Sequence, residues 1–91
     1  MSVEVRVPTI LRTYTQGASE VSASGDTLSA VLDDLEAHYA GIRARVLDDN
    51  GRLRRFVNVY VGDEDVRFLD DLATPTPDGT KVSIIPAVAG G

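Results

Sequence analysis

The chain has 91 residues, of which 43% are hydrophobic and 25% are charged, and it contains no cysteine. This length and composition are typical of one small folded domain without disulfides, and they exclude an intrinsically disordered chain. The formal net charge of −5 argues against a nucleic-acid partner and favours partners with basic surfaces. Because no segment has the length of a membrane span or the pattern of a signal peptide, we expect no membrane insertion and a cytoplasmic location.

The first part of the chain predicts a β-hairpin. Residues 3–7 alternate between valine and charged side chains, which is typical of a half-buried strand, and this strand ends at Pro8. Residues 9–15 predict a loop or short turn. Residues 18–23, with Val21 pointing inward, predict a second strand that pairs with the first.

An amphipathic helix of about three turns is predicted after a turn at residues 24–26. Its apolar residues recur at helical spacing, and acidic residues occupy the opposite face. Asp26 or Thr27 is the expected N-cap, and Gly41 stands where a C-cap glycine belongs. The apolar positions of this helix are Leu28, Val31, Leu32, Leu35 and Tyr39.

The second half of the chain predicts further strands joined by turns. Residues 42–55 have no clear period and predict a loop with room for a short helical turn, and Asn50-Gly51 is a strong turn signal. Residues 56–61 alternate cleanly and predict a strand. The elements expected after it are a short strand at 66–68, a helical turn at 70–73, and a final strand at 80–86 whose Val82 and Ile84 face inward.

This order of elements favours an α+β fold, in which one main helix crosses one face of a mixed sheet of four to five strands. If the first and last strands are neighbours at the centre of the sheet, they run parallel, and the helix supplies the crossover between the two halves. That is the ubiquitin-like β-grasp arrangement. We expect the β-grasp domain to span residues 1–86 and a flexible tail to span residues 87–91.

The tail is the candidate reactive group. Two glycines close it, after Pro86 has ended strand pairing. Glycines can thread a narrow channel and bring a terminal carboxylate into a partner's active site. Because the chain has no thiol, any carrier chemistry is expected at Gly91. The alternative is an ordinary frayed chain end. The tail residues are Ala87, Val88, Ala89, Gly90 and Gly91.

The whole chain resembles a known family. Its order of elements and its Gly-Gly end are similar to ubiquitin and to the bacterial sulfur carriers of the ThiS and MoaD type. A more specific resemblance is to the carriers of actinobacterial cysteine synthesis, the CysO type. The stretches that carry it are VPTILR at 7–12, VSASGDTL at 21–28, FVN at 56–58, GDEDVRF at 62–68 and IPAVAGG at 85–91.

The resemblance implies that the chain is a protein co-substrate of partner enzymes and not an enzyme. An E1-like enzyme would use ATP and Mg²⁺ to adenylate the carboxylate of Gly91, and a sulfur donor would then displace AMP and leave a thiocarboxylate. In the CysO-type branch the sulfur would attack an activated serine derivative on a pyridoxal-phosphate enzyme, and a metalloprotease would then release cysteine. The chain itself would bind no cofactor.

Three alternatives stay open at this point. Related carriers supply sulfur for molybdopterin, thiamin or sulfur-containing natural products. A ubiquitin-like modifier would instead link the adenylated Gly91 to lysines of other proteins. A plain interaction domain would have an inert tail.

A docking surface for the activating enzyme is expected on the sheet face that points away from the helix. Exposed aromatic and apolar side chains on this face exceed what a monomer needs and are typical of partner-binding patches. The alternative is that the 42–55 loop covers Phe56 or Tyr60. The residues predicted to dock the partner are Phe56, Tyr60, Ile85, Phe68 and Arg6.

Other candidate sites carry weaker signals. His38 is the only histidine, so we interpret it as a solvated helix residue and expect no metal site. The acidic stretches at 48–51 and 63–65 lack the spacing of a calcium-binding loop and are interpreted as turns. A solvated loop is also a better interpretation than a phosphate site for Arg43, Arg45, Arg52, Arg54 and Arg55.

Overall fold

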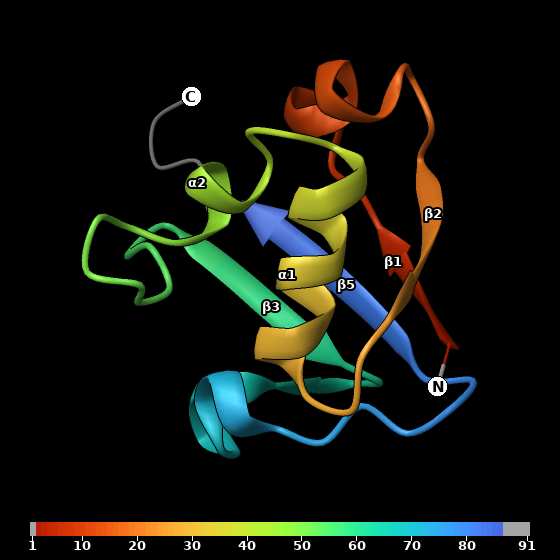
Figure 1. Cartoon of the computed structure of the whole chain (residues 1–91). Coiled ribbons are helices and arrows are strands. Elements are labelled where there is room, and N and C mark those ends of the chain that lie inside the picture. Colours follow the sequence, from red (N-terminus) through yellow and green to blue (C-terminus); the bar gives the residue numbers. More distant parts are fainter. Residues whose placement is uncertain (1, 87–91) are drawn as a thin grey trace.

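The computed structural model describes residues 2–86, which form one mixed sheet with a helix packed across one face (Figure 1). The strands are β1 (Ser2–Arg6), β2 (Glu20–Ser24), β3 (Val57–Val61), β4 (Glu64–Asp65) and β5 (Lys81–Pro86). Their order in the sheet is β2-β1-β5-β3-β4. β1 and β5 are parallel neighbours, and the other neighbouring strands pair in antiparallel fashion.

Short helices connect these strands. They are η1 (Thr9–Thr15), α1 (Leu28–His38), α2 (Arg43–Val46), η2 (Val66–Phe68) and η3 (Asp71–Ala73), where η denotes a 3-10 helix. α1 begins after Thr27, whose hydroxyl accepts a hydrogen bond from the Ala30 N–H at 3.3 Å. This bond satisfies one of the N–H groups that a helix start leaves free. Within residues 2–86, no helix has the length and apolar character that crossing a bilayer requires.

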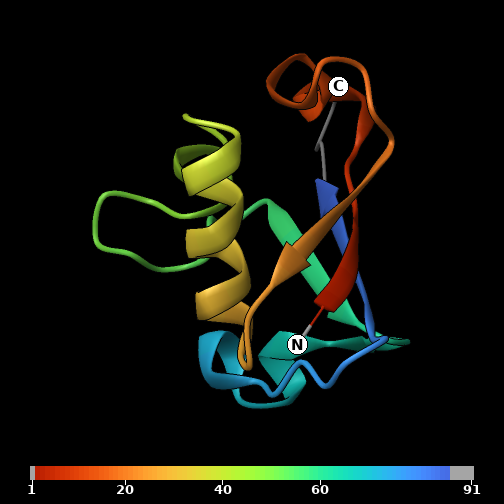
Figure 2. The ribbon, with the colours of Figure 1, turned by 45° about the vertical axis from the view of Figure 1, so that its right-hand side comes forward.

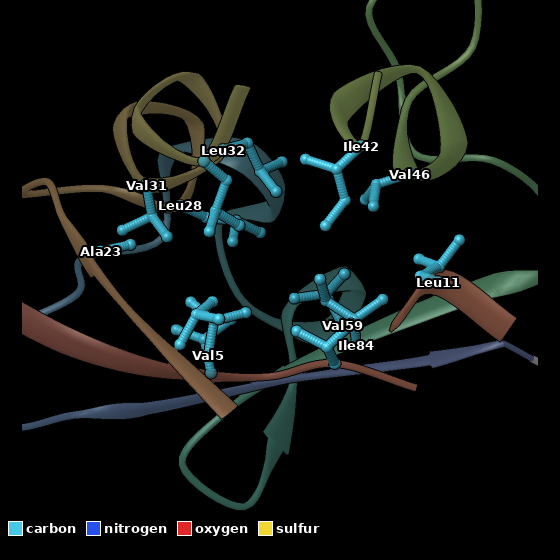
Figure 3. Packing of buried hydrophobic residues seen from close by; sticks show 14 of the residues in the cluster. Val5, Leu11, Ala23, Leu28, Val31, Leu32, Ile42, Val46, Val59 and Ile84 are labelled. Atoms are coloured by element: carbon cyan, nitrogen blue, oxygen red, sulfur yellow. The ribbon is translucent and has the colours of Figure 1, made fainter. Parts of the chain in front are cut away.

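A single apolar layer fills the space between α1 and the sheet (Figure 3). Leucine and valine side chains of α1 point toward the sheet, and alternate residues of the strands point back at them. Side chains from η1 and from the α2 segment close one end of the layer. Since each buried large side chain contributes about 1.5–3 kcal/mol, this layer is the main source of stability. Labelled members are Val5, Leu11, Ala23, Leu28, Val31, Leu32, Ile42, Val46, Val59 and Ile84.

The topology confirms the β-grasp arrangement expected from the sequence. At the centre of the sheet Val5 lies opposite Val82 in parallel register, and Val5 also pairs with Val21 in the β1–β2 hairpin. The amphipathic helix, its Thr27 cap and the strand at β3 are confirmed as well. β2 begins two residues later than predicted.

Two sequence predictions are wrong in detail. Residues 66–68 form η2 and not a strand, because the Asp65 carboxylate accepts the Arg67 N–H at 2.9 Å and starts a helical turn there. The edge strand of the sheet is instead β4, which precedes these residues in the chain. Gly41 is not the C-cap of α1. Tyr39 holds that position, and Gly41 lies beyond it in the left-handed region, with φ 98°.

Candidate functional site

The end of β5 is the point from which the predicted tail departs. Pro86 lies beside Val57 of β3, whereas β1 accompanies β5 only as far as Ser83, which is opposite Arg6. Past Arg6 the chain leaves the sheet at Pro8, which has φ −68° and no N–H to offer β5. The last three residues of β5 therefore have no strand partner on that side.

The tail itself was predicted to carry the chemistry. Its adenylation site, Gly91, and the segment expected to thread into a partner lie outside the described residues. Their roles stay predictions, as does the division of the chain into a domain and a tail. The threading residues concerned are Ala87, Val88, Ala89 and Gly90.

An open groove of about 460 Å³ lies beside the end of β5. Residues 6–10, Arg12 and residues 84–86 line it. The Arg12 Nε donates to the carbonyl oxygen of Val7 at 3.1 Å, which holds the start of η1 close to the end of β1. The groove thus combines apolar walls with two guanidinium groups at the base of the predicted tail.

The sheet face opposite α1 carries several of the predicted docking residues. Figure 2 shows α1 on one side of the sheet, with the other face turned away from it. By strand register, Arg6, Ser83 and Tyr60 form a row across β1, β5 and β3, and Ile85 lies opposite Asn58 in β3. Arg6 and Ile85 are exposed and Tyr60 is half-buried. The strands therefore bring Arg6, Tyr60 and Ile85 to one surface.

Phe56 stands just before β3, at the same end of the sheet as Pro86. Its side chain is 58% exposed, so the 42–55 loop does not cover it. This excludes, for Phe56, the alternative in which that loop buries the ring. Phe56 therefore remains free to contact a partner that approaches the tail end.

Phe68 is placed differently. It lies on η2, after the edge strand β4, and β4 pairs with the Tyr60–Val61 end of β3. In Figures 1 and 2 this region lies at the opposite end of the molecule from the end of β5. The structure thus places Phe68 near the Tyr60 end of β3 and away from the end of β5 that carries Ile85.

Ile10 is a candidate contact that the sequence analysis missed. It is 61% exposed and lines the groove together with Ile85, whereas the next residue, Leu11, is buried. Residues 9–15 show no helical or strand period, because a 3-10 helix repeats every three residues and is short. The only available signal was a large aliphatic residue two positions after Pro8.

Comparison with known proteins shows which family the chain belongs to. A family model described as the ThiS family matches residues 5–91. The chain belongs to the ThiS family. The ThiS-family match includes every strand of the sheet except the first residues of β1, and it also spans the predicted tail.

Individual relatives are similar to this chain over most or all of its length. The sulfur carrier protein CysO of Mycobacterium tuberculosis is 60% identical, over 100% of both chains. The small archaeal modifier protein 3 of Haloferax volcanii is 43% identical over 65 residues, which is 71% of this chain and 70% of that protein. In the crystal structure of an Amycolatopsis orientalis BexX/CysO complex, a chain 50% identical superposes with a TM-score of 0.92, covering 98% of this chain and 99% of that one. The fold is the β-grasp fold of such carriers.

Two carboxylates among the described residues hold the backbone of loops. The N–H groups of Gly41 and Arg43 each donate to the Glu36 carboxylate at 2.9 Å and hold its pKa below the ordinary value. The Arg52 N–H lowers the pKa of Asp48 in the same way. Both carboxylates organise loops, without the burial that raises the pKa of a catalytic acid.

A metal site is not formed by the part of the chain that the structure describes. Within residues 2–86, no three histidine or acidic side chains lie close enough together to hold a metal ion. The His38 Nδ1 instead lies 2.9 Å from the carbonyl oxygen of Asp34, one turn earlier in α1.

Proposed function

We propose that this chain is a sulfur carrier, whose Gly91 carboxylate is adenylated by an E1-like enzyme and converted to a thiocarboxylate that donates sulfur for cysteine synthesis. The observation that carries the proposal is the 60% identity, over the full length of both chains, to the sulfur carrier protein CysO. Family membership and the superposition on CysO in the BexX/CysO complex support it.

The chemistry explains why a partner enzyme is needed. A terminal carboxylate has an ordinary pKa of about 3.5 and is ionised at neutral pH, so its carbon is a poor electrophile. Attack of this carboxylate on the α-phosphate of ATP forms the acyl-adenylate and releases pyrophosphate. A sulfur nucleophile then adds to the acyl carbon, and AMP leaves with the bonding electron pair. The chain contributes only the acyl group, which makes it a co-substrate and not an enzyme.

The tail-end surface is our proposed docking site for the activating enzyme. Arg6, Tyr60 and Ile85 lie on one sheet face, and Phe56 is exposed at the same end. Ile10 joins this set, because it lines the groove beside the end of β5. A partner seated there would lie directly over the base of the tail and could receive the terminal carboxylate.

Further partners follow from the CysO likeness. A pyridoxal-phosphate synthase would accept the sulfur, and a metalloprotease would release cysteine and restore the Gly-Gly end. The relative from Amycolatopsis orientalis is found in a complex with BexX. ATP and Mg²⁺ belong to the activating partner in this scheme, and we place the carrier with its ATP-dependent partner in the cytoplasm.

A second candidate function is protein modification. It is favoured by the 43% identity to the small archaeal modifier protein 3. Here a lysine amine, in place of sulfur, would attack the adenylated Gly91 and form an isopeptide bond. Sulfur donation to molybdopterin, thiamin or a natural product is the corresponding alternative among acceptors.

ATP–pyrophosphate exchange tests the activation step. We expect an E1-like enzyme from the same organism to catalyse exchange only when the chain is present. The matched control is the same chain without Gly90 and Gly91, which keeps the described domain and should support no exchange. Equal exchange with both chains, or none with either, would contradict the proposal.

A further inference from the structure

The exposed large apolar side chains of the described residues divide into two groups. Ile10, Phe56 and Ile85 lie at the end of the sheet where β5 ends, and they are 61%, 58% and 46% exposed. Phe68 and Leu69 lie beyond β4 at the other end, and they are 86% and 40% exposed. Figures 1 and 2 show these two ends on opposite sides of the molecule. The chain therefore presents two separate apolar surfaces.

The two surfaces differ in charge. Exposed carboxylates flank Phe68 and Leu69 in the sequence, whereas the groove at the other end is lined by two arginines and no acidic residue. The one arginine near Phe68, Arg67, is turned back toward the sheet, because its guanidinium donates to the Asn58 Oδ1 and to the Arg54 carbonyl oxygen, each at 2.7 Å. The exposed carboxylates are those of Asp63, Glu64, Asp70 and Asp71.

The shapes of the two surfaces are also complementary. The groove is an open depression of about 460 Å³ with apolar walls that include Ile10 and Ile85. At the opposite end, the Phe68 ring projects from a short 3-10 helix with most of its surface in solvent. One end thus carries carboxylates and a projecting aromatic ring. The other is an apolar depression lined by Arg6 and Arg12, with Glu20 of β2 opposite Arg6 in register.

We propose that Phe68 and Leu69 of one copy of this chain dock in the groove of a second copy, so that the chain associates head to tail. Arg6 and Arg12 of the groove would then face the carboxylates around Phe68. Because two different surfaces meet, the contact is heterologous and each dimer keeps one free surface of each kind. No contact of this geometry can form within a single copy, since the surfaces lie at opposite ends.

The net charge of the chain and the small size of the contact determine how strongly two copies associate. The net charge of −5 makes two copies repel each other at long range, but at about 0.15 M salt this repulsion is screened beyond about 8 Å. The contacting arginine and carboxylate groups lie closer than that. Since the contact involves few residues on each side, we expect weak association that weakens further at high salt.

Sedimentation velocity of the full chain tests the proposal directly. From about 10 μM to about 1 mM, a range that brackets weak association, the weight-average mass should rise with concentration and should fall again in high salt. Phe68→Ala removes the projecting ring, and Arg6→Glu reverses a charge of the groove. Each variant alone should stay monomeric. The matched control is Ala37→Ser, an exposed change on α1 outside both surfaces, which should behave as wild type.

Mixing the two variants gives the decisive outcome. Phe68→Ala retains an intact groove and Arg6→Glu retains an intact ring, so an equimolar mixture should form a dimer and nothing longer. A wild-type chain that stays monomeric over the whole range would overturn the proposal. So would wild-type dimers that the variants form equally well, because such dimers would use another surface.

A measurement on the unaltered chain removes any dependence on variant folding. Amide chemical shifts followed over the same concentrations should change at residues 6–12, 84–86 and 63–71. Changes confined to other residues, or shifts that are independent of concentration, would contradict head-to-tail docking. Neither readout requires Gly91 to be activated, so the result stands apart from the proposed sulfur-carrier function.

Discussion

At the scale of single residues, Glu36 joins the end of α1 to the segment that follows it. Its carboxylate accepts the N–H groups of Gly41 and Arg43, and these bonds lower its pKa from the ordinary value of 4.5. A carboxyl group with a lowered pKa in the folded state stabilises the fold at neutral pH. That contribution is lost as the pH falls below about 4.5 and through the lower folded value.

The corresponding prediction concerns Glu36→Gln. This variant should lose stability at pH 7 and should show a smaller fall in unfolding free energy between pH 7 and pH 3 than the wild type. Urea unfolding at both pH values measures the difference. Asp49→Asn is the control, because Asp49 is exposed and makes none of the hydrogen bonds found among the described residues. An identical fall in Glu36→Gln and in the wild type would show that these bonds do not stabilise the fold.

Gly41 is a second residue whose surroundings require a particular side chain, in this case none. Its φ of 98° is in the left-handed region, and a Cβ there would lie 3.0 Å from the Tyr14 Cε1. Gly41→Ala should therefore destabilise the fold by about 1–3 kcal/mol, through backbone strain and this close contact. Gly51→Ala is the matched control, because Gly51 has φ 77° with open space around it. If chemical denaturation gives Gly41→Ala no greater cost than Gly51→Ala, the Tyr14 contact is unimportant.

At the scale of secondary-structure elements, the start of α1 gives the clearest prediction. The Thr27 hydroxyl accepts the Ala30 N–H, and no acidic residue occupies the first turn to compensate for its loss. Thr27→Ala should cost about 1 kcal/mol, whereas Thr27→Ser should retain most of the stability. Thermal or urea unfolding distinguishes the two. A serine variant as unstable as the alanine variant would indicate that the methyl group of threonine matters, and not the hydrogen bond.

The same scale shows why sequence patterns succeeded for some elements and failed for others. Strict alternation at residues 3–7 and 56–61 identified two strands, because each strand has one buried face. Residues 66–68 alternate as well, but the Asp65 side chain starts a helical turn there. Alternation over three residues is too short to outweigh one capping hydrogen bond.

Local sequence patterns could not predict the groove either, because it depends on tertiary pairing. It exists because β1 leaves the sheet at Pro8 while β5 continues to Pro86, and strand lengths across a sheet are set by tertiary pairing. Sequence periodicity identified Ile85 as outward-facing, but Ile10 has no periodic neighbours. The groove that joins them depends on contacts between residues about 75 positions apart in the chain.

At the scale of the whole molecule, the two ends of the sheet have different expected roles. If the tail end docks the activating enzyme, Phe56→Ala and Ile85→Ala should each raise the KM of adenylation by about tenfold, with little change in kcat. Ile10→Ala should act in the same direction. Ser22→Ala, an exposed change on β2, is the matched control. Unchanged kinetics in both Phe56→Ala and Ile85→Ala would remove this surface from the account.

The central claim is that Gly91 carries sulfur, and mass spectrometry of the C-terminal tryptic peptide tests it most directly. Trypsin cleaves after Lys81, so the peptide 82–91 separates the reactive end from Met1, whose oxidation would cause nearly the same nominal mass change as exchanging oxygen for sulfur. In protein purified from its native cells, we expect a heavier peptide that reacts with a thiol alkylator. An unmodified peptide, even after incubation with the E1-like partner, ATP and a sulfur donor, would contradict it.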